Sequence, residues 1–129
     1  MTKTIDSQVS ELLPKWEESF KKGLLSFWIL FSLTQRSMYA YEMKSEILKF
    51  SQGSISAEDN SIYRALRRFI DTGLIDSEFQ TSPNGPARKY FSLTDLGTEL
   101  LRQFIERNLL VFQSEAFVIA CKNYLTNNI

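Results

Sequence analysis

The sequence contains no histidine and a single cysteine, Cys121, and these two absences exclude several kinds of active site. One cysteine cannot form an internal disulfide, and without histidine it cannot belong to a Cys/His catalytic dyad or to the usual zinc sites. The acidic residues are scattered without an obvious pair, and no glycine-rich phosphate loop occurs. We therefore expect a protein that is not an enzyme and that holds no cofactor and no metal.

Long hydrophobic runs are also missing. The longest one, residues 23–33 (GLLSFWILFSL), is interrupted by Ser26 and Ser32, and it is far shorter than the roughly 18 to 20 residues of a membrane span. We interpret it as a buried helix and expect no contact with a membrane. Residues 1–22 are polar and mixed in charge, unlike a secretory signal peptide, so the expected location is the cytoplasm.

The material that is present suits one small domain with an appended helix. The chain has 129 residues, of which 43% are hydrophobic, and its ten phenylalanines and two tryptophans supply bulky side chains for a core. The formal net charge is zero, which argues against indiscriminate binding to nucleic acid. However, residues 60–93 hold five of the basic and only three of the acidic side chains, so a positive excess lies in the middle of the chain.

Apolar residues recur at helical spacing along most of the sequence. Pro14 is expected near the start of the first helix, where a missing N–H costs little, and Gly73 is expected to cap the fourth. Thr94 caps a final helix that could run to Leu125, with a break near Asn108 left open. The predicted helices cover residues 9–22, 24–34, 39–50, 58–72 and 94–125.

The period changes to two after Gly73, which predicts strands over 74–79 and 89–93. They are joined across residues 82–86, where Asn84-Gly85 is a strong turn signal. Three helices, a hairpin and a further helix form the order of a winged helix-turn-helix. The predicted fold is therefore mainly α with a small β-hairpin, extended by an N-terminal helix and a long C-terminal helix.

The fourth predicted helix carries three of the arginines on or beside its exposed face. Its apolar side consists of Ile62, Ala65, Leu66, Phe69 and Ile70, and the opposite face consists of Asn60, Arg64, Arg67 and Asp71, flanked by Tyr63 and Arg68. One interpretation is a solvated face on which Arg67 pairs with Asp71, worth only a few tenths of a kcal/mol. The other is DNA contact, which the following hairpin with its Arg88 and Lys89 favours.

Four short motifs occur in order between residues 21 and 100: KGLL (22–25), YAYE (39–42), NSIYRAL with GLI (60–66 and 73–75), and RKYFSLT with Gly97 (88–94). Together they resemble the PadR family of bacterial transcriptional regulators. Ala40 stands where that family usually has glycine. Glu58 and Asp59 place acids at the start of the recognition helix that the resemblance implies, where they suit the helix dipole but repel a phosphate.

The resemblance implies a homodimeric repressor whose recognition helices enter the major grooves of double-stranded DNA. We predict that Asn60, Ser61 and Arg64, nearest the helix start, reach base edges. Tyr41 is also expected to contact DNA. The residues predicted to hold phosphates are Tyr63, Arg67, Arg68, Arg88 and Lys89.

The resemblance also implies that the C-terminal helix provides the dimer contact. Its stripe of apolar residues is wider than an intrachain core needs beyond residue 104, whereas residues 94–104 fit the intrachain core. Residues 1–22 are expected to join the interface, 23–93 to form the winged helix and 94–129 to form the dimerisation helix. The predicted interface residues are Leu12, Trp16, Leu101, Ile105, Leu109, Phe112, Ala116 and Ile119.

Three further interpretations stay open. Trp16 and Trp28 either pack in the core or line a pocket for an aromatic small-molecule effector, as in some members of the resembled family. Cys121 is expected to be a small buried residue. The chain as a whole could instead be a protein-interaction or ligand-sensing module that does not bind DNA, an alternative that the acidic pair Glu58-Asp59 supports.

Overall fold

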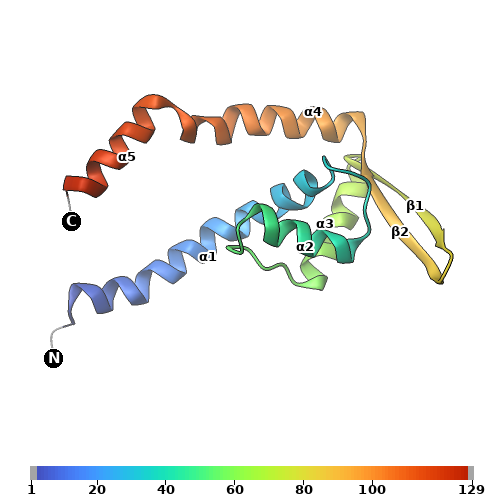
Figure 1. Cartoon of the computed structure of the whole chain (residues 1–129), viewed down its shortest axis with the longest axis horizontal. Coiled ribbons are helices and arrows are strands. Elements are labelled where there is room, and N and C mark those ends of the chain that lie inside the picture. Colours follow the sequence, from blue (N-terminus) through green and yellow to red (C-terminus); the bar gives the residue numbers. More distant parts are fainter. Residues whose placement is uncertain (1–2, 128–129) are drawn as a thin grey trace.

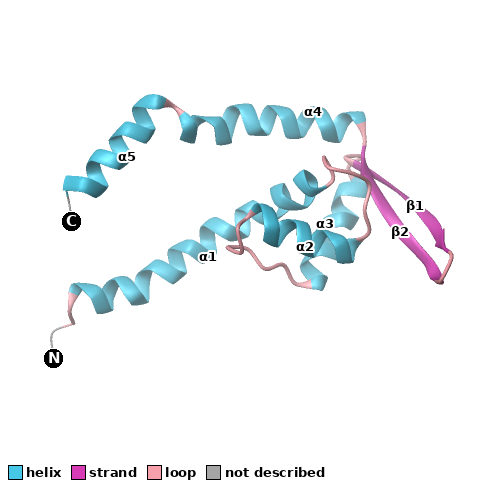
Figure 2. Ribbon diagram, in the orientation of Figure 1, coloured by secondary structure: helices cyan, strands magenta, loops and turns pink. Residues whose placement is uncertain are grey.

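The computed structural model describes residues 3–127, apart from the side chain of Ser82. The predicted segments 1–22 and 94–129 therefore each contain two residues, 1–2 and 128–129, outside the described part. Three helices are followed by an antiparallel hairpin and a further helical segment, so the predicted mainly α winged helix is confirmed (Figures 1 and 2). The elements are α1 (Ile5–Ser32), α2 (Ala40–Phe50), α3 (Asp59–Asp71), β1 (Ile75–Ser82), β2 (Gly85–Leu93), α4 (Asp95–Phe104) and α5 (Glu115–Asn127).

Helix α1 is one continuous helix, where the sequence predicted two. The Thr4 hydroxyl accepts the Ser7 N–H at 3.1 Å and starts the helix, so Pro14 lies well inside it and not near its start. The helix tolerates Pro14 because Ser10, whose carbonyl loses its partner, lies on an exposed stretch where water can reach it. Gly23 does not interrupt the helix either. The continuous α1 therefore carries its N-terminal half out beyond the body of the molecule (Figure 1).

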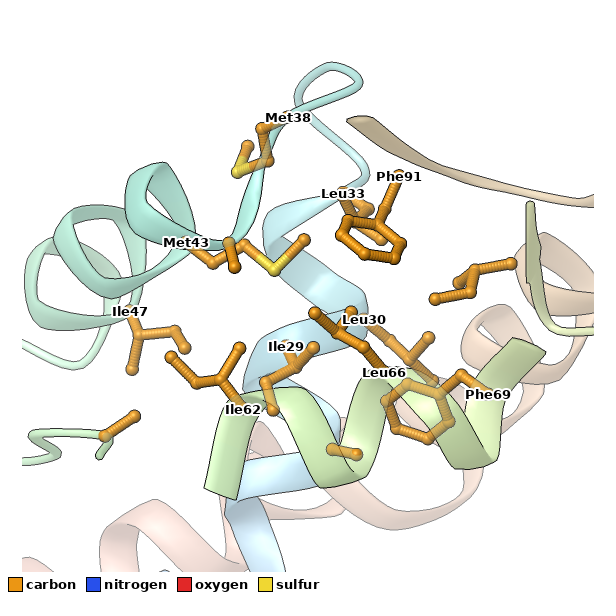
Figure 3. Close-up of a cluster of buried hydrophobic side chains, with 14 of the residues drawn as sticks. Ile29, Leu30, Leu33, Met38, Met43, Ile47, Ile62, Leu66, Phe69 and Phe91 are labelled. Atoms are coloured by element: carbon orange, nitrogen blue, oxygen red, sulfur yellow. The ribbon is translucent and has the colours of Figure 1, made fainter. Parts of the chain in front are cut away.

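The core lies between α1, α2 and α3 and is closed by the hairpin. Ile29 of α1, Met43 and Ile47 of α2, and Ile62 of α3 are almost completely buried, and Figure 3 shows these side chains converging. Phe91 of β2 adds an aromatic ring to the same cluster. Its backbone exchanges two hydrogen bonds with Met38, of 3.1 and 2.9 Å. The segment before α2 is thereby fastened to the hairpin.

The junction of α3, the hairpin and α4 is held by a few close backbone contacts. Gly73 has a φ of 79° after the end of α3, as its predicted capping role requires. The Thr94 hydroxyl donates to the Gly73 carbonyl at 2.6 Å, and it also accepts the Gly97 N–H at 3.1 Å. Gly97 lies so close to Leu74 that an added Cβ would be 2.1 Å from the Leu74 carbonyl oxygen. Only glycine therefore fits at position 97.

The hairpin is longer than the sequence predicted, because its polar outer ends also pair. Its register places Ile75 opposite Leu93 and Phe79 opposite Lys89, with an irregularity between Gln80 and Ser82. Gly85 pairs with Ser82, so the reversal falls at Pro83-Asn84 instead of Asn84-Gly85. This shift of one residue corrects the predicted turn. Lys89 and the buried Phe91 lie two positions apart in β2 and therefore on the same side of the strand.

The C-terminal segment is interrupted where the sequence left continuity open, so it does not form one long helix. Residues Ile105–Leu109 form a π-helical turn and Leu110–Gln113 a 3₁₀ turn. The Asn108 side chain donates to the Phe104 carbonyl at 3.2 Å, in competition with the backbone ladder. Ser114 is extended, with ψ of 142°, and its hydroxyl accepts the Phe117 N–H at 3.3 Å. An N-cap at Ser114 thus starts α5 as a separate helix.

Two arms leave the winged-helix body on the side away from the hairpin (Figure 1). One arm is the N-terminal half of α1, and the other is the end of α4 together with α5. Nearly all side chains on both arms are exposed within the single chain. Among residues 3–127, no helix has the length and apolar character that crossing a membrane requires.

Replacing two glycines by alanine should have opposite effects on stability. Gly97→Ala forces a methyl group against the Leu74 carbonyl, and we expect it to destabilise the fold by about 3 kcal/mol or more. Gly23→Ala adds a methyl group to open space inside α1, and it should stabilise by roughly 0.5–1 kcal/mol. Urea unfolding followed by circular dichroism measures both. Equal midpoints for the two variants would contradict the close approach at Gly97.

Candidate nucleic-acid interface

Helix α3 separates its apolar and polar sides as the sequence predicted. Ile62, Ala65, Leu66 and Phe69 are buried, and Ile70 lies at the edge of the core with 36% of its surface exposed. The opposite side carries a shallow depression lined by Asn60, Tyr63, Arg64 and Arg67. These four predicted DNA-contacting residues therefore share one accessible surface.

The hairpin adds Lys89 to this surface. A groove of about 370 Å³ runs between α3 and β2. Next to the groove, Phe79 is 72% exposed and lies opposite Lys89 in the hairpin. Phe79 was not among the predicted site residues. The Lys89 ammonium is 6.0 Å from the Phe79 ring centroid and 5.9 Å from that of Phe91. The groove is lined by Tyr63, Leu66, Arg67, Ile70, Asp71, Lys89 and Phe91.

Arg88 makes its contact with a different helix. Its guanidinium carbon lies 4.5 Å from the centroid of the Tyr39 ring, just before α2. Tyr41, in the first turn of α2, is exposed and stacks on Tyr39 with centroids 6.4 Å apart. The two neighbouring wing cations are thus directed to different partners, Lys89 toward α3 and Arg88 toward the start of α2.

Arg68 and Ser61 lie to one side of the shared surface. The Arg68 guanidinium points to α1, with its Nη2 3.5 Å from the Ser26 hydroxyl. Ser61 is half-buried, whereas Asn60 and Arg64 are exposed. Within residues 3–127, the structure does not contain the Arg67–Asp71 ion pair that the solvated-face interpretation requires. The Arg67 guanidinium is therefore not engaged in an ion pair with Asp71.

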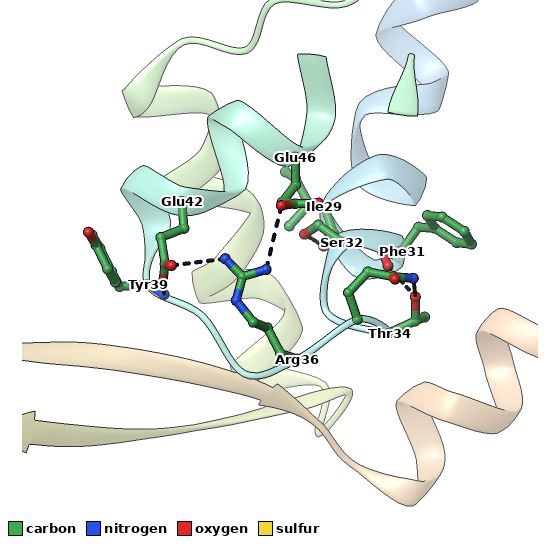
Figure 4. Close-up of polar contacts among 9 residues, drawn as sticks. Ile29, Phe31, Ser32, Thr34, Arg36, Tyr39, Glu42 and Glu46 are labelled. Carbon is green, nitrogen blue, oxygen red and sulfur yellow. Dashed lines mark hydrogen bonds and ion pairs between the residues drawn. The ribbon is translucent and has the colours of Figure 1, made fainter. Parts of the chain in front are cut away.

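One acidic side chain at the start of α3 is paired with a cation of another helix. The Lys44 ammonium of α2 lies 3.0 Å from the Asp59 carboxylate of α3, so one member of the acidic pair at the helix start is neutralised. Lys44 was not recognised in the sequence, because its partner is on another helix. Behind α2, Arg36 bonds Glu42 at 2.9 Å and Glu46 at 3.5 Å (Figure 4). The hydrogen bond that Arg36 donates to the Glu42 carboxylate is the main cause that raises the pKa of Arg36.

Each of the two arms exposes apolar side chains. Trp16 is 78% and Phe112 53% exposed, and Leu12 and Ile119 are also accessible. Ala116 is exposed as well, while Ile105 and Leu109 are half-buried. Leu101 is a correction to the predicted set, because it is only 3% exposed and packs in the intrachain core. The buried Leu101 side chain is therefore not available for contact with a second copy of the chain.

The outer side of α4 is charged. Arg102 pairs with Glu99 and with Glu106, the latter at 2.6 Å. Hydrogen bonds from Arg102 and then Gln103 lower the pKa of Glu99 to about 2. Glu99 therefore stays ionised at acidic pH values at which an ordinary glutamate takes up a proton.

An aromatic groove of about 550 Å³ lies where α1 faces the end of α4. Trp28 stacks edge-on against Phe27 with centroids 5.2 Å apart, and its buried indole Nε1–H has no hydrogen-bond partner among the described residues. Trp16 does not line this groove within the single chain. Trp28, Phe20, Leu24, Phe27, Phe31, Phe50, Phe104, Ile105, Asn108, Leu109, Leu110, Phe112 and Gln113 line it.

Cys121 is exposed, although the sequence predicted a small buried residue. The reason is that α5 lies at the outer end of its arm, beyond the winged-helix body (Figure 1), so that nearly all of its side chains lie at the surface of the single chain.

The three-helix core, the hairpin after α3 and the cationic side of α3 define a winged helix-turn-helix protein. Comparison with known proteins gives the family. The model of the "Transcriptional regulator PadR-like family" matches residues 29–103. The chain belongs to this PadR-like family of transcriptional regulators, which confirms the resemblance noted in the sequence.

Solved structures of similar proteins share the fold. A PadR-like transcriptional regulator from Bacillus cereus is 32% identical, with 81% of this chain and 93% of that chain covered and a TM-score of 0.56. A transcriptional regulator from Clostridium thermocellum is 22% identical, with coverage of 74% and 92% and a TM-score of 0.64. Bacillus subtilis PadR, solved in complex with operator DNA, is 23% identical, with coverage of 82% and 60% and a TM-score of 0.59.

Proposed function

We propose that this protein is a cytoplasmic, non-enzymatic transcriptional regulator that binds double-stranded DNA as a homodimer and represses transcription by occupying an operator. The observation that carries the proposal is the surface on which α3 and the wing bring Tyr63, Arg67 and Lys89 together beside Asn60 and Arg64. A helix with this exposed face fits the major groove, and a hairpin beside it reaches the neighbouring backbone. Solved PadR bound to operator DNA has the same fold.

In this proposal the residues divide between base edges and phosphates. Asn60, Arg64 and, from the side, Ser61 lie in the first turns of α3 and face the bases, where arginine can bind guanine through two hydrogen bonds. Arg67 and Lys89 lie farther along the groove and neutralise phosphates. Tyr41, Tyr63 and Arg88 extend the contact to the flanking backbone. Because Arg68 points to Ser26, its contribution is smaller than that of Arg67.

A winged helix that captures a protein instead of DNA is the alternative function. It drew support from the acids at the start of α3, and the Lys44–Asp59 ion pair weakens that support because it neutralises one of them. DNA binding therefore fits the charge of this surface better.

Two substitutions distinguish base contacts from phosphate contacts. Arg64→Ala should lower the preference for a selected operator over a scrambled duplex, because each lost base contact removes about 1–3 kcal/mol of discrimination. Lys89→Ala should weaken binding to both duplexes equally and reduce the slope of log affinity against log salt by about 2 per dimer. Fluorescence anisotropy across salt concentrations measures both quantities.

Two controls accompany this experiment. Lys49→Ala removes a charge at the end of α2 far from Tyr41 and should leave affinity unchanged, and Arg68→Ala should cost less than Arg67→Ala. Salt-independent binding by the wild type, or the same effect for Arg64→Ala and Lys89→Ala, would refute the assigned roles.

The homodimer forms, in this proposal, through the two apolar arms. Residues 1–22 and 94–129 supply the contact and residues 23–93 the DNA-binding body. The large apolar side chains of the arms are exposed in the single chain, and a second copy of the chain, related by two-fold symmetry, is the simplest way to bury them. The interface then includes Leu12, Trp16, Ile105, Leu109, Phe112, Ala116 and Ile119, and the two bodies present α3 to half-sites about one helical turn, or a multiple of it, apart.

Charged substitutions on the arms should separate the dimer. We expect the double variant Trp16→Lys, Phe112→Lys to sediment as a monomer while its circular dichroism stays that of the wild type, because both side chains are exposed in the single chain. Phe79→Lys is the matched control, since Phe79 is an exposed aromatic residue on the wing, and it should not alter sedimentation. A monomeric wild type in analytical ultracentrifugation would disprove the proposed dimer.

Binding of an aromatic effector in the groove around Trp28 is a second candidate function. Stacked rings and an unpaired buried indole N–H suit a planar ligand that carries an oxygen acceptor. The ligand would lie next to the arms and could alter how the two copies pack.

Tryptophan fluorescence tests this second function. Trp16→Phe leaves Trp28 as the single reporter, and a planar aromatic acid should quench it in a saturable manner. The Trp28→Phe variant should bind the same aromatic acid about 1–3 kcal/mol more weakly, because the N–H donor is lost. Calorimetry measures this affinity. Unchanged affinity in Trp28→Phe would show that the indole N–H does not bind the ligand.

A further inference from the structure

One ring, that of Tyr39, connects the wing to the start of α2. The Arg88 guanidinium carbon lies 4.5 Å from its centroid, and Tyr90 meets it edge-on at 5.5 Å with an interplanar angle of 69°. Tyr41 stacks on it with an interplanar angle of 13°. Tyr39 is half-buried, whereas Arg88 and Tyr41 are exposed. The half-buried ring thus contacts two exposed side chains.

The backbone of Tyr39 is fixed on both sides. The preceding residue, Met38, exchanges two hydrogen bonds with Phe91 of β2. The Tyr39 N–H donates to the Glu42 carboxylate at 3.3 Å, and Glu42 in turn is held by Arg36 (Figure 4). The position of the ring is therefore set by the fold and does not depend on a bound ligand.

A guanidinium on an aromatic face keeps its hydrogen-bonding edges free. The attraction acts through the flat face of the group, while its N–H donors point outward in the plane and can still bind a phosphate. The stacked arginine is also restricted to fewer rotamers before DNA arrives, so that less side-chain entropy is lost on binding. The contacts of Lys89 with Phe79 and Phe91 are longer, and an ammonium has no planar face to stack.

We propose that Tyr39 is a positioning residue for DNA binding, which holds the Arg88 guanidinium on the outer face of the wing for a phosphate without touching the DNA itself. This inference rests on the proposed function, because it specifies how one of the phosphate contacts is preorganised. Tyr39 lies inside the YAYE motif, and only Tyr41 was selected from that motif by sequence. The feature that distinguishes Tyr39 is its contact with a strand almost fifty positions away, which is a property of the fold.

The test is a double-mutant cycle on binding to a short labelled duplex of random sequence, since phosphate contacts do not depend on sequence. Tyr39→Phe keeps the ring and should bind within about twofold of the wild type, because stacking needs only the aromatic face. Tyr39→Leu should weaken binding about fivefold or more per dimer, the loss expected from one exposed cation–π contact in each subunit. The cycle is run in a Tyr41→Ala background, because Tyr41 also stacks on Tyr39. In that background, Tyr39→Leu should have no further effect once Arg88 is replaced by alanine.

Arg88→Lys supplies a variant that leaves Tyr39 intact, in case Tyr39→Leu does not fold. It keeps the charge and should keep the salt slope, yet it should lose affinity to the same extent as Tyr39→Leu because the planar stack is gone. An NMR signature accompanies these measurements. The Arg88 side-chain protons should be shifted upfield by the ring in the wild type and in Tyr39→Phe, but not in Tyr39→Leu.

The outcomes separate this inference from the proposed function. If the wild type binds the duplex but the effects of Tyr39→Leu and Arg88→Ala multiply, Tyr39 has only a structural role and the inference is wrong. Wild-type affinity in Arg88→Lys would overturn it equally. If the wild type binds no DNA at any salt concentration, the proposed function itself fails, and the inference fails with it.

Discussion

The 2.6 Å hydrogen bond from the Thr94 hydroxyl to the Gly73 carbonyl joins the end of the wing to the end of α3. Around it, Gly97 packs against the Leu74 backbone with no room for a side chain. These contacts set the angle between α3 and the hairpin, and they also set the direction in which α4 leaves the body. The cationic surface and the aromatic groove therefore depend on the same junction.

Charge in this protein is organised by location, since its sum is zero. Lys44 of α2 forms an ion pair with Asp59 of α3 and so neutralises one acidic side chain at the start of that helix. Cations on α3 and the wing stay accessible, while Arg36 and Arg102 are bound to carboxylates elsewhere. An electrically neutral chain can in this way carry a local positive surface without a positive charge over the whole molecule.

The elements that the sequence predicted well are those governed by local chemistry. The apolar stripe of α3, the glycine after it and the Thr94 cap all follow from residues within one or two turns of each other. Predictions failed where a local signal was overruled by its surroundings. Pro14 was expected to mark a helix start, but an exposed helix tolerates its missing hydrogen bond. Asn84-Gly85 was expected to form the turn, but strand pairing extends to Gly85.

The sequence by itself determined the order of the elements, the membership of the family and the cationic side of α3, because periodicity and short motifs encode these directly. Only the tertiary structure decided which cation faces which partner: Arg68 toward α1, Lys89 toward α3 and Arg88 toward Tyr39. It alone also showed that Leu101 is interior and Cys121 exterior. The physical reason is that these placements depend on contacts between residues far apart in the chain, which local pattern cannot report.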